Sequence, residues 1–182
     1  LLCSFLSSFS NQRTDRYGGD LTGRSRFALE VLKTVRERVG PDFPIICRLS
    51  GDEYVDQGLK IAETTKIAGL LEEQSADAVH ISACNAASGY LNHPPYYVEE
   101  GVFVHLAEAI KAAVNIPVIA VGRIRTPQLA DRIIREGKAD LVSMGRALIA
   151  DAHLPNKAKE GRLDEIMPCV SCNKCIQTLR KD

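Results

Sequence analysis

The sequence predicts an α/β fold with a parallel sheet, and more narrowly the C-terminal half of a (β/α)8 barrel, strands 5 to 8. Four short apolar segments alternate with helical patterns, an order typical of right-handed β–α–β units. The last two segments both end in Gly-Arg, and the loops after strands 7 and 8 form the phosphate site of many such barrels. The chain has 182 residues, whereas a complete barrel has about 250. An open doubly wound sheet is the alternative, but its glycine-rich fingerprint is missing from the first strand–helix turn.

Each predicted element has a local reason. Helical spacing of apolar residues predicts a helix over 21–39, with Asp20 as its N-cap and Gly40-Pro41 at its end. Thr126-Pro127 begins another helix, as N-cap and first helical residue. In chain order, the predicted helices cover residues 21–39, 59–74, 102–114 and 127 to about 137, and the predicted strands begin near residues 44, 76, 116 and 140.

Several polar residues lie in or near these elements. Arg48 is at the C-terminal end of the first predicted strand, where a buried charge needs a partner. His80 is on the second predicted strand, and we expect it to be packed or hydrogen-bonded. We expect Asp15 and Arg24 to pair and hold the turn before the first helix. The long irregular segment 83–101 has the length of a functional loop.

Composition excludes several classes of function. Basic and acidic residues balance at 23 each, so we expect no nucleic-acid partner and no attraction to a membrane surface. No apolar run approaches the ~18 residues of a membrane-spanning helix. The first residues lack a basic leader, and Cys3, Cys47 and Cys84 are scattered through the chain. This pattern is typical of a reducing cytoplasm, where we expect the protein to lie.

The two Gly-Arg pairs, Gly122-Arg123 and Gly145-Arg146, form the candidate phosphate site. Glycine lets the backbone approach a ligand, and arginine offers a planar fork of donors that suits phosphate. The N-terminus of a following helix would add unpaired N–H groups. One such pair is more often an ordinary turn, but two pairs on consecutive strand ends favour a phosphate site.

A cysteine run follows the last predicted helix. Cys169, Cys172 and Cys175 have the spacing C-x2-C-x2-C, which lets one loop supply three thiolates to a soft metal centre. Iron–sulfur clusters favour such runs. Zinc, with four thiolate or imidazole ligands, is the competing metal, and a turn without any metal is the third interpretation.

Five segments occur together and in a familiar order: residues 11–19 followed by Arg24, residues 47–50, residues 121–124, residues 144–146 and the cysteine run. As a set they resemble the old yellow enzyme family. More narrowly, they resemble its iron–sulfur flavoprotein branch, which includes 2,4-dienoyl-CoA reductase, 2-enoate reductase and trimethylamine dehydrogenase. The resemblance covers almost the whole chain.

The resemblance implies an FMN-binding barrel. Arg48 matches the arginine beside the flavin pyrimidine ring, where a fixed cation stabilises negative charge on the reduced flavin. Gly122, Arg123, Gly145 and Arg146 match the FMN phosphate site. Cys169, Cys172 and Cys175 match three of the four ligands of a 4Fe–4S cluster, and the fourth is expected beyond this sequence.

The resemblance also implies NAD(P)H as electron source, with FAD in a further C-terminal domain outside this sequence. The histidine and tyrosine motif on the substrate side would precede Leu1, so no catalytic proton donor is assigned. Dienoyl reductases carry a histidine in the loop after the sixth strand, and no histidine falls at the matching place here. His93 is the candidate to fill that role from a shifted position.

The predicted function is that of an FMN- and 4Fe–4S-dependent NAD(P)H oxidoreductase that reduces an activated C=C bond in a small molecule of enoate or dienoyl-CoA type. An amine dehydrogenase of the same branch is one alternative, and a non-redox phosphate-binding barrel with a zinc tail is another. Residues 1–160 are assigned to the half-barrel and 161–182 to the start of the cluster segment. Half a barrel leaves sheet edges exposed, so we expect these residues not to fold stably alone. The sequence does not specify the substrate, the choice between NADH and NADPH, or the oligomeric state.

Overall fold

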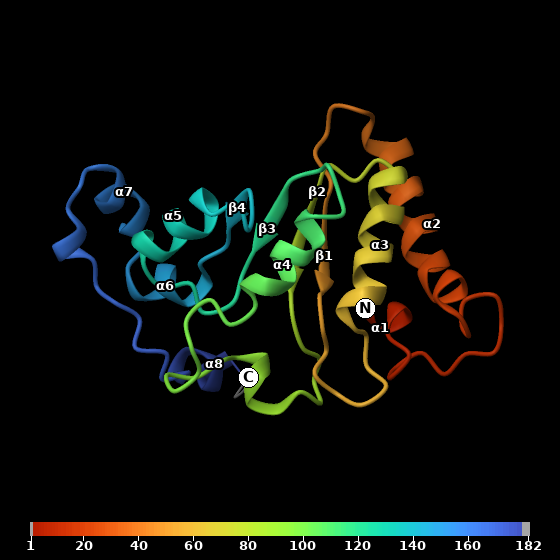
Figure 1. The fold of residues 1–182 in the computed structure, drawn as a ribbon, viewed down its shortest axis with the longest axis horizontal. Coiled ribbons are helices and arrows are strands. Elements are labelled where there is room, and N and C mark those ends of the chain that lie inside the picture. The colour runs from red at the N-terminus through yellow and green to blue at the C-terminus, as the bar shows by residue number, and fades with distance from the viewer. Residues whose placement is uncertain (1, 180–182) are drawn as a thin grey trace.

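The computed structural model describes residues 2–179 and contains one parallel sheet flanked by helices (Figure 1). Its strands are β1 (Ile46–Ser50), β2 (Ala78–Ser82), β3 (Val118–Ala120) and β4 (Leu141–Val142), in the order β1-β2-β3-β4. Each neighbouring pair is parallel. The strand order follows the chain order, so these strands lack the reversal of a doubly wound sheet. The predicted parallel α/β fold is confirmed.

Four main helices accompany the strands: α2 (Leu21–Val39), α3 (Ile61–Glu73), α4 (Val104–Lys111) and α5 (Pro127–Arg135). The first precedes β1 and the others connect successive strands. The shorter helices are α1 (Leu2–Leu6), η1 (Gly89–Asn92), α6 (Gly145–Ala150), α7 (Leu154–Lys159), η2 (Leu163–Glu165) and α8 (Lys174–Leu179). None of the helices in residues 2–179 has both the length and the apolar character needed to span a membrane.

The predicted caps account for the positions of the main helices. The Asp20 carboxylate accepts a hydrogen bond of 2.8 Å from the N–H of Gly23, at the start of α2. The Thr126 hydroxyl accepts one of 3.3 Å from the N–H of Leu129, at the start of α5. Each cap satisfies an N–H group that has no partner within the helix. The observed α2 coincides with the predicted range 21–39.

The two faces of the sheet differ in burial. Val79, Ile81 and Val118 are completely buried, and they belong to the same apolar core as residues of α3 and α4. Alternate residues point to the opposite face, where Ile46 is 56% exposed and Leu141 is 51% exposed. The helices therefore cover one face, and the other face is open along part of its area in the described chain.

The expected pairing of Asp15 with Arg24 is wrong. Asp15 pairs with Arg13 on the surface. Arg24 is buried and donates hydrogen bonds to the carbonyls of Leu6, at 2.8 Å, and Gly19, at 2.9 Å. Its guanidinium also forms an ion pair with Glu63 at the start of α3. Arg24 thus does hold the turn, but through a backbone carbonyl and through contacts that are distant in sequence.

Candidate functional site

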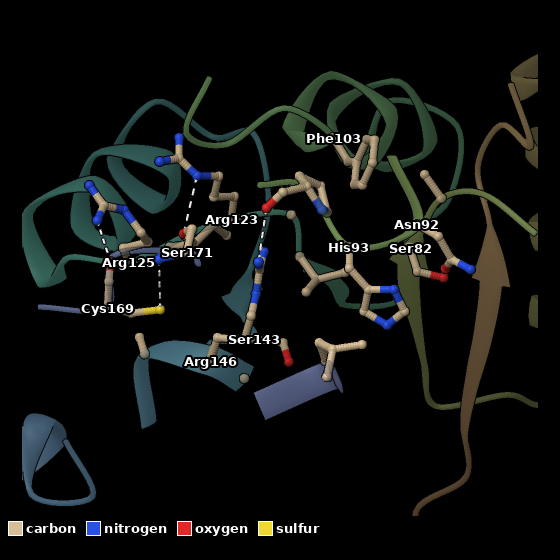
Figure 2. Close-up of a pocket in the computed structure, with 18 of the residues that line it drawn as sticks. Ser82, Asn92, His93, Phe103, Arg123, Arg125, Ser143, Arg146, Cys169 and Ser171 are labelled. Atoms are coloured by element: carbon tan, nitrogen blue, oxygen red, sulfur yellow. Dashed lines mark hydrogen bonds between the residues drawn. The ribbon is translucent and has the colours of Figure 1, made fainter. Parts of the chain in front are cut away.

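A pocket of about 250 Å³ lies at the carboxyl ends of the strands (Figure 2). Ser82 ends β2, Gly122 follows β3 and Gly145 follows β4, so three consecutive strand ends form its wall. The long loop 83–101 and the cysteine run form the remaining sides. Of the residues predicted from the sequence, the pocket lining includes Arg48, His93, Gly122, Arg123, Gly145, Arg146 and Cys169.

Arg48 points to the open face of the sheet, directly beside His80 in the strand register. No hydrogen bond or ion pair to its guanidinium occurs within residues 2–179. The expectation of a buried, partnered charge is therefore wrong for the described chain, because this face is open and Arg48 is exposed. An unpaired cation in a pocket wall is available to an anionic or electron-rich ligand.

His80 is packed, as expected, but it is not fully hydrogen-bonded. Its Nε2 atom is buried and has no hydrogen-bond partner within the described chain. Burial lowers the pKa of His80, and the neighbouring Arg48 lowers it further. The imidazole is therefore biased toward its neutral form.

Gly122 is the position where the backbone most clearly requires glycine. Its φ is +134°, and a Cβ atom there would lie 2.8 Å from the ring atom Cδ2 of Phe103. Phe103 is buried and its ring stacks on Tyr54 at 5.9 Å between centroids. The strand end can follow this path only because no side chain separates it from Phe103.

All three guanidinium nitrogens of Arg123 donate to the protein. Its Nε donates to the Ser171 hydroxyl at 3.3 Å, and its Nη2 donates to the Tyr96 carbonyl at 2.9 Å. Its Nη1 donates to the carbonyl of Val98. Burial lowers the pKa of Arg123, and the positive charge of Arg125 adds to this effect. No helix begins directly after this pair, because α5 starts only at Pro127. For this pair, the expected helix N-terminus at the site is wrong.

The second pair matches the expectation better. Helix α6 begins at Gly145 itself, and a Cβ atom on Gly145 would meet nothing within 4 Å. Arg146 donates from Nη1 to the Pro94 carbonyl at 2.8 Å and to the Asn173 side chain. Its Nε and Nη2 have no hydrogen-bond acceptor among residues 2–179. Gly145-Arg146 therefore presents open backbone and free donors to the pocket.

His93 lies in the pocket between Arg146 on one side and Ser82 and Asn92 on the other (Figure 2). Its carbonyl accepts a hydrogen bond of 2.8 Å from the Asn173 side chain. The structure thus brings His93 to the candidate site. Its role on the substrate side stays a prediction.

The cysteine run curls back on itself. Ser171 and Asn173 have positive φ angles of 54° and 60°, and the Ser171 N–H donates to the Sγ of Cys169 at 3.4 Å. Cys169 and Cys175 are half-buried, and Cys172 is exposed. Within residues 2–179, the thiols do not converge with other ligand side chains into a preformed metal site. The predicted metal ligation stays a prediction.

Sequence reasoning missed Arg125 and Glu100. Arg125 lines the pocket, pairs with Glu100 and donates to the carbonyl of Cys169. Arg125 lies two residues after Arg123, so the sequence Gly-Arg-Ile-Arg was the available signal. Its partners are 25 and 44 residues away along the chain, and no local pattern reveals them.

Comparison with known proteins identifies the family. Residues 1–165 match the NADH:flavin oxidoreductase / NADH oxidase family. The chain belongs to this family. Its fold is shared with structural neighbours of TIM-barrel type, and the family description names NADH and a flavin. The predicted resemblance to old yellow enzyme relatives is confirmed at this level.

Three similar proteins illustrate the range of this family. A NADH oxidase of Thermoanaerobacter brockii is 48% identical over 173 residues, which cover 95% of this chain and 27% of that protein. The structure of a 2-naphthoyl-CoA reductase complex has a TM-score of 0.90 and 34% identity, covering 96% of this chain and 26% of the other. Histamine dehydrogenase from Rhizobium sp. 4-9 has a TM-score of 0.86 and 35% identity, covering 97% and 25%. The chain thus spans about a quarter of the length of each.

Proposed function

We propose that the intact protein is an FMN- and 4Fe–4S-dependent NAD(P)H oxidoreductase that reduces an activated C=C bond. Residues 1–160 would form strands 5 to 8 of its FMN barrel, and residues 161–182 the start of its iron–sulfur segment. The single observation that carries this proposal is the composition of the pocket. One cavity gathers Arg48, which has no side-chain partner within the described chain, both Gly-Arg pairs and Cys169 from the cysteine run.

The pocket residues fit FMN. The free donors of Arg146 and the open space over Gly145 suit a phosphate group. Arg48 would lie beside the isoalloxazine and stabilise negative charge on it. Bound FMN, supplied with NAD(P)H electrons through the cluster, would provide the hydride that reduces the substrate. Gly122 and Arg123 would shape the wall of the site, because Gly122 packs against Phe103 and Arg123 donates to carbonyls of the loop.

The cysteine run fits an iron–sulfur cluster in its donor chemistry. Cys169, Cys172 and Cys175 would supply three thiolates, and the cluster would supply single-electron transfer. The Ser171 N–H that points at Cys169 Sγ is the type of hydrogen bond that tunes cluster thiolates. The positive φ angles at Ser171 and Asn173 turn the backbone back on itself, which favours wrapping around one centre.

The open face of the sheet supports the half-barrel. An apolar cavity of about 220 Å³ lies beside β1, lined by residues such as Leu2, Val35 and Ile46. In the described chain β1 pairs only with β2, and an unpaired hydrophobic strand edge is normally covered in a native protein. The preceding strands of the same barrel would cover both the edge and the open face.

His93 is proposed as a substrate-side residue. It lines the pocket next to Arg146, and its carbonyl is held by Asn173. We expect His93→Asn to change the rate or KM for substrate and to leave FMN content unchanged. Loss of FMN with normal substrate kinetics would instead place His93 on the cofactor.

An amine dehydrogenase is the second candidate. A histamine dehydrogenase matches this chain about as well as the naphthoyl-CoA reductase does. Three exposed tyrosines of the loop also form one aromatic cluster, with Tyr97 at 5.9 Å from Tyr90 and 5.3 Å from Tyr96 between ring centroids. Aromatic faces attract ammonium groups, so this cluster is compatible with a cationic amine.

The test is to purify the intact protein without oxygen and to measure FMN, iron, acid-labile sulfide and zinc. FMN with iron and sulfide supports the proposal, whereas zinc without flavin would favour the non-redox barrel. Anaerobic assays then decide the direction of the reaction. NAD(P)H oxidation that depends on an α,β-unsaturated acid or its CoA thioester supports C=C reduction. Reduction of the bound flavin by an amine alone would support the amine dehydrogenase and overturn C=C reduction.

A further inference from the structure

Three arginines of the pocket connect the long loop to the cysteine run. Each arginine donates hydrogen bonds to one residue of the cysteine run and to one or two residues of loop segment 94–100. The contacts are Arg125 to Cys169 and Glu100, Arg123 to Ser171, Val98 and Tyr96, and Arg146 to Asn173 and Pro94. The loop numbers fall as the run numbers rise, so these contacts pair the two segments in opposite chain directions.

Arg125 has no part in the proposed function, yet of the three arginines it is the one that contacts Cys169, the first cysteine of the run. Its Nε donates to a carboxylate oxygen of Glu100 at 2.7 Å, and its Nη2 contacts the same oxygen. Its Nη1 donates to the backbone carbonyl of Cys169. Only 24% of the Arg125 side chain and 31% of the Glu100 side chain are exposed. The pair is therefore shielded well enough to fix geometry, unlike most surface ion pairs.

We propose that Arg125, held by Glu100, is a positioning residue that fixes Cys169 against the pocket wall and couples the cysteine run to loop 94–100. Glu100 orients the guanidinium, so that one of its N–H groups points at the Cys169 carbonyl. The Arg125 contacts connect two segments that no strand or long helix joins. An effect of Arg125 on a metal centre rests on the proposed function, but the coupling of the two segments does not.

The geometry distinguishes arginine from lysine at this position. The planar guanidinium reaches the carboxylate and the carbonyl at the same time, through nitrogens on different edges of its fork. A lysine ammonium keeps the charge but is a point donor on a flexible stem. We therefore expect Arg125→Lys to lose most of the coupling although it keeps the charge.

The test that does not depend on metal is amide hydrogen exchange of the intact protein, followed in segments 94–100 and 169–173. We expect Arg125→Ala and Arg125→Lys to speed exchange in both segments together, with Glu100→Gln showing a smaller effect of the same kind. Arg135→Ala is the matched control, because Arg135 is a 78% exposed arginine whose ion pair within residues 2–179 is with Asp131 on α5. Unchanged exchange in both segments, or a change in only one, would overturn the proposal whatever the metal content. Far-UV circular dichroism identifies any variant that fails to fold, and Arg125→Lys keeps the test decisive in that case.

The second arm measures iron retention after anaerobic reconstitution. Groups that orient metal ligands typically change metal affinity by about 10- to 100-fold, and we expect at least a tenfold faster loss of iron to a chelator in Arg125→Gln. The reduction potential of the cluster should fall in Arg125→Gln, which removes a positive charge, and rise in Glu100→Gln, which removes a negative charge. Equal potentials in both variants would overturn a positioning role at the cluster. A wild-type protein that takes up no iron would refute the proposed function, while the exchange experiment would still decide the coupling.

Discussion

Replacing Gly122 with alanine should destabilise the protein at the strand end that forms the pocket. The φ of +134° is unfavourable for any residue with a Cβ atom, and such strain costs about 1–3 kcal/mol. The new Cβ would lie 2.8 Å from Phe103 Cδ2 and 3.0 Å from Phe103 Cβ. Because Phe103 is buried and stacked on Tyr54, it cannot move away freely, and overpacking adds about 1–3 kcal/mol. The loss of unfolded-state entropy offsets somewhat less than 1 kcal/mol. Together these terms predict a net loss of about 1–5 kcal/mol.

Gly145→Ala is the matched control, since a Cβ at Gly145 meets nothing within 4 Å. We expect it to leave stability unchanged or to raise it by up to about 1 kcal/mol, and yet to weaken FMN retention, because the new methyl group would occupy the space proposed for the cofactor. The midpoint of urea denaturation, measured with and without added FMN, separates the effect on stability from the effect on FMN retention. If Gly122→Ala is as stable as Gly145→Ala, the reasoning from the Phe103 contact is wrong. If Gly145→Ala retains FMN as the wild type does, Gly145 does not face the cofactor.

Three further substitutions have definite expected results. Arg48→Gln should change stability by no more than about 0.5 kcal/mol, because Arg48 has no partner within residues 2–179, and it should lower the flavin reduction potential in a spectroelectrochemical titration; an unchanged potential would remove Arg48 from the flavin. Arg24→Leu should destabilise by about 3 kcal/mol in urea, since it strands two carbonyls and the partly exposed Glu63, and a loss below about 1 kcal/mol would contradict this role. Burial lowers the pKa of His80 below its ordinary 6.5, so the unfolded chain binds the proton more readily, and stability should fall as pH drops below 6.5 toward the folded pKa; His80→Gln should flatten that dependence, and equal slopes at pH 5–8 for both proteins would refute it.

The elements that could be predicted from the sequence are those governed by local interactions. Helix α2 is bounded by Asp20 and Gly40, and α5 begins at the Thr126-Pro127 signal, so short-range hydrogen bonds and backbone preferences determine their ends. The short helices α1 and α7 were missed. They have 5 and 6 residues, too few for a periodic apolar pattern, and helices of that length depend on packing against the rest of the fold.

The contacts of the candidate site, in contrast, join residues that are far apart in the sequence. Arg146 reaches Pro94, which is 52 residues away, and Arg123 reaches Ser171, which is 48 residues away. The sequence could identify Arg123 as a strand-end arginine, since parallel strands place their carboxyl ends together. It could not identify what the guanidinium binds. That depends on where loop 83–101 and the cysteine run lie once the sheet has formed.

The twin Gly-Arg pairs illustrate why a motif predicts a location better than a role. From the sequence the two pairs are equivalent, because each follows an apolar strand. In the structure, Gly122 packs against Phe103 and all three nitrogens of Arg123 donate to the protein. Gly145 instead faces open space at the start of α6, and Arg146 keeps two nitrogens without an acceptor in the described chain. A ligand can recruit only donors that the protein has left free. The phosphate-binding energy should therefore come mainly from the second pair, while the first pair holds the pocket wall to the loop and the cysteine run.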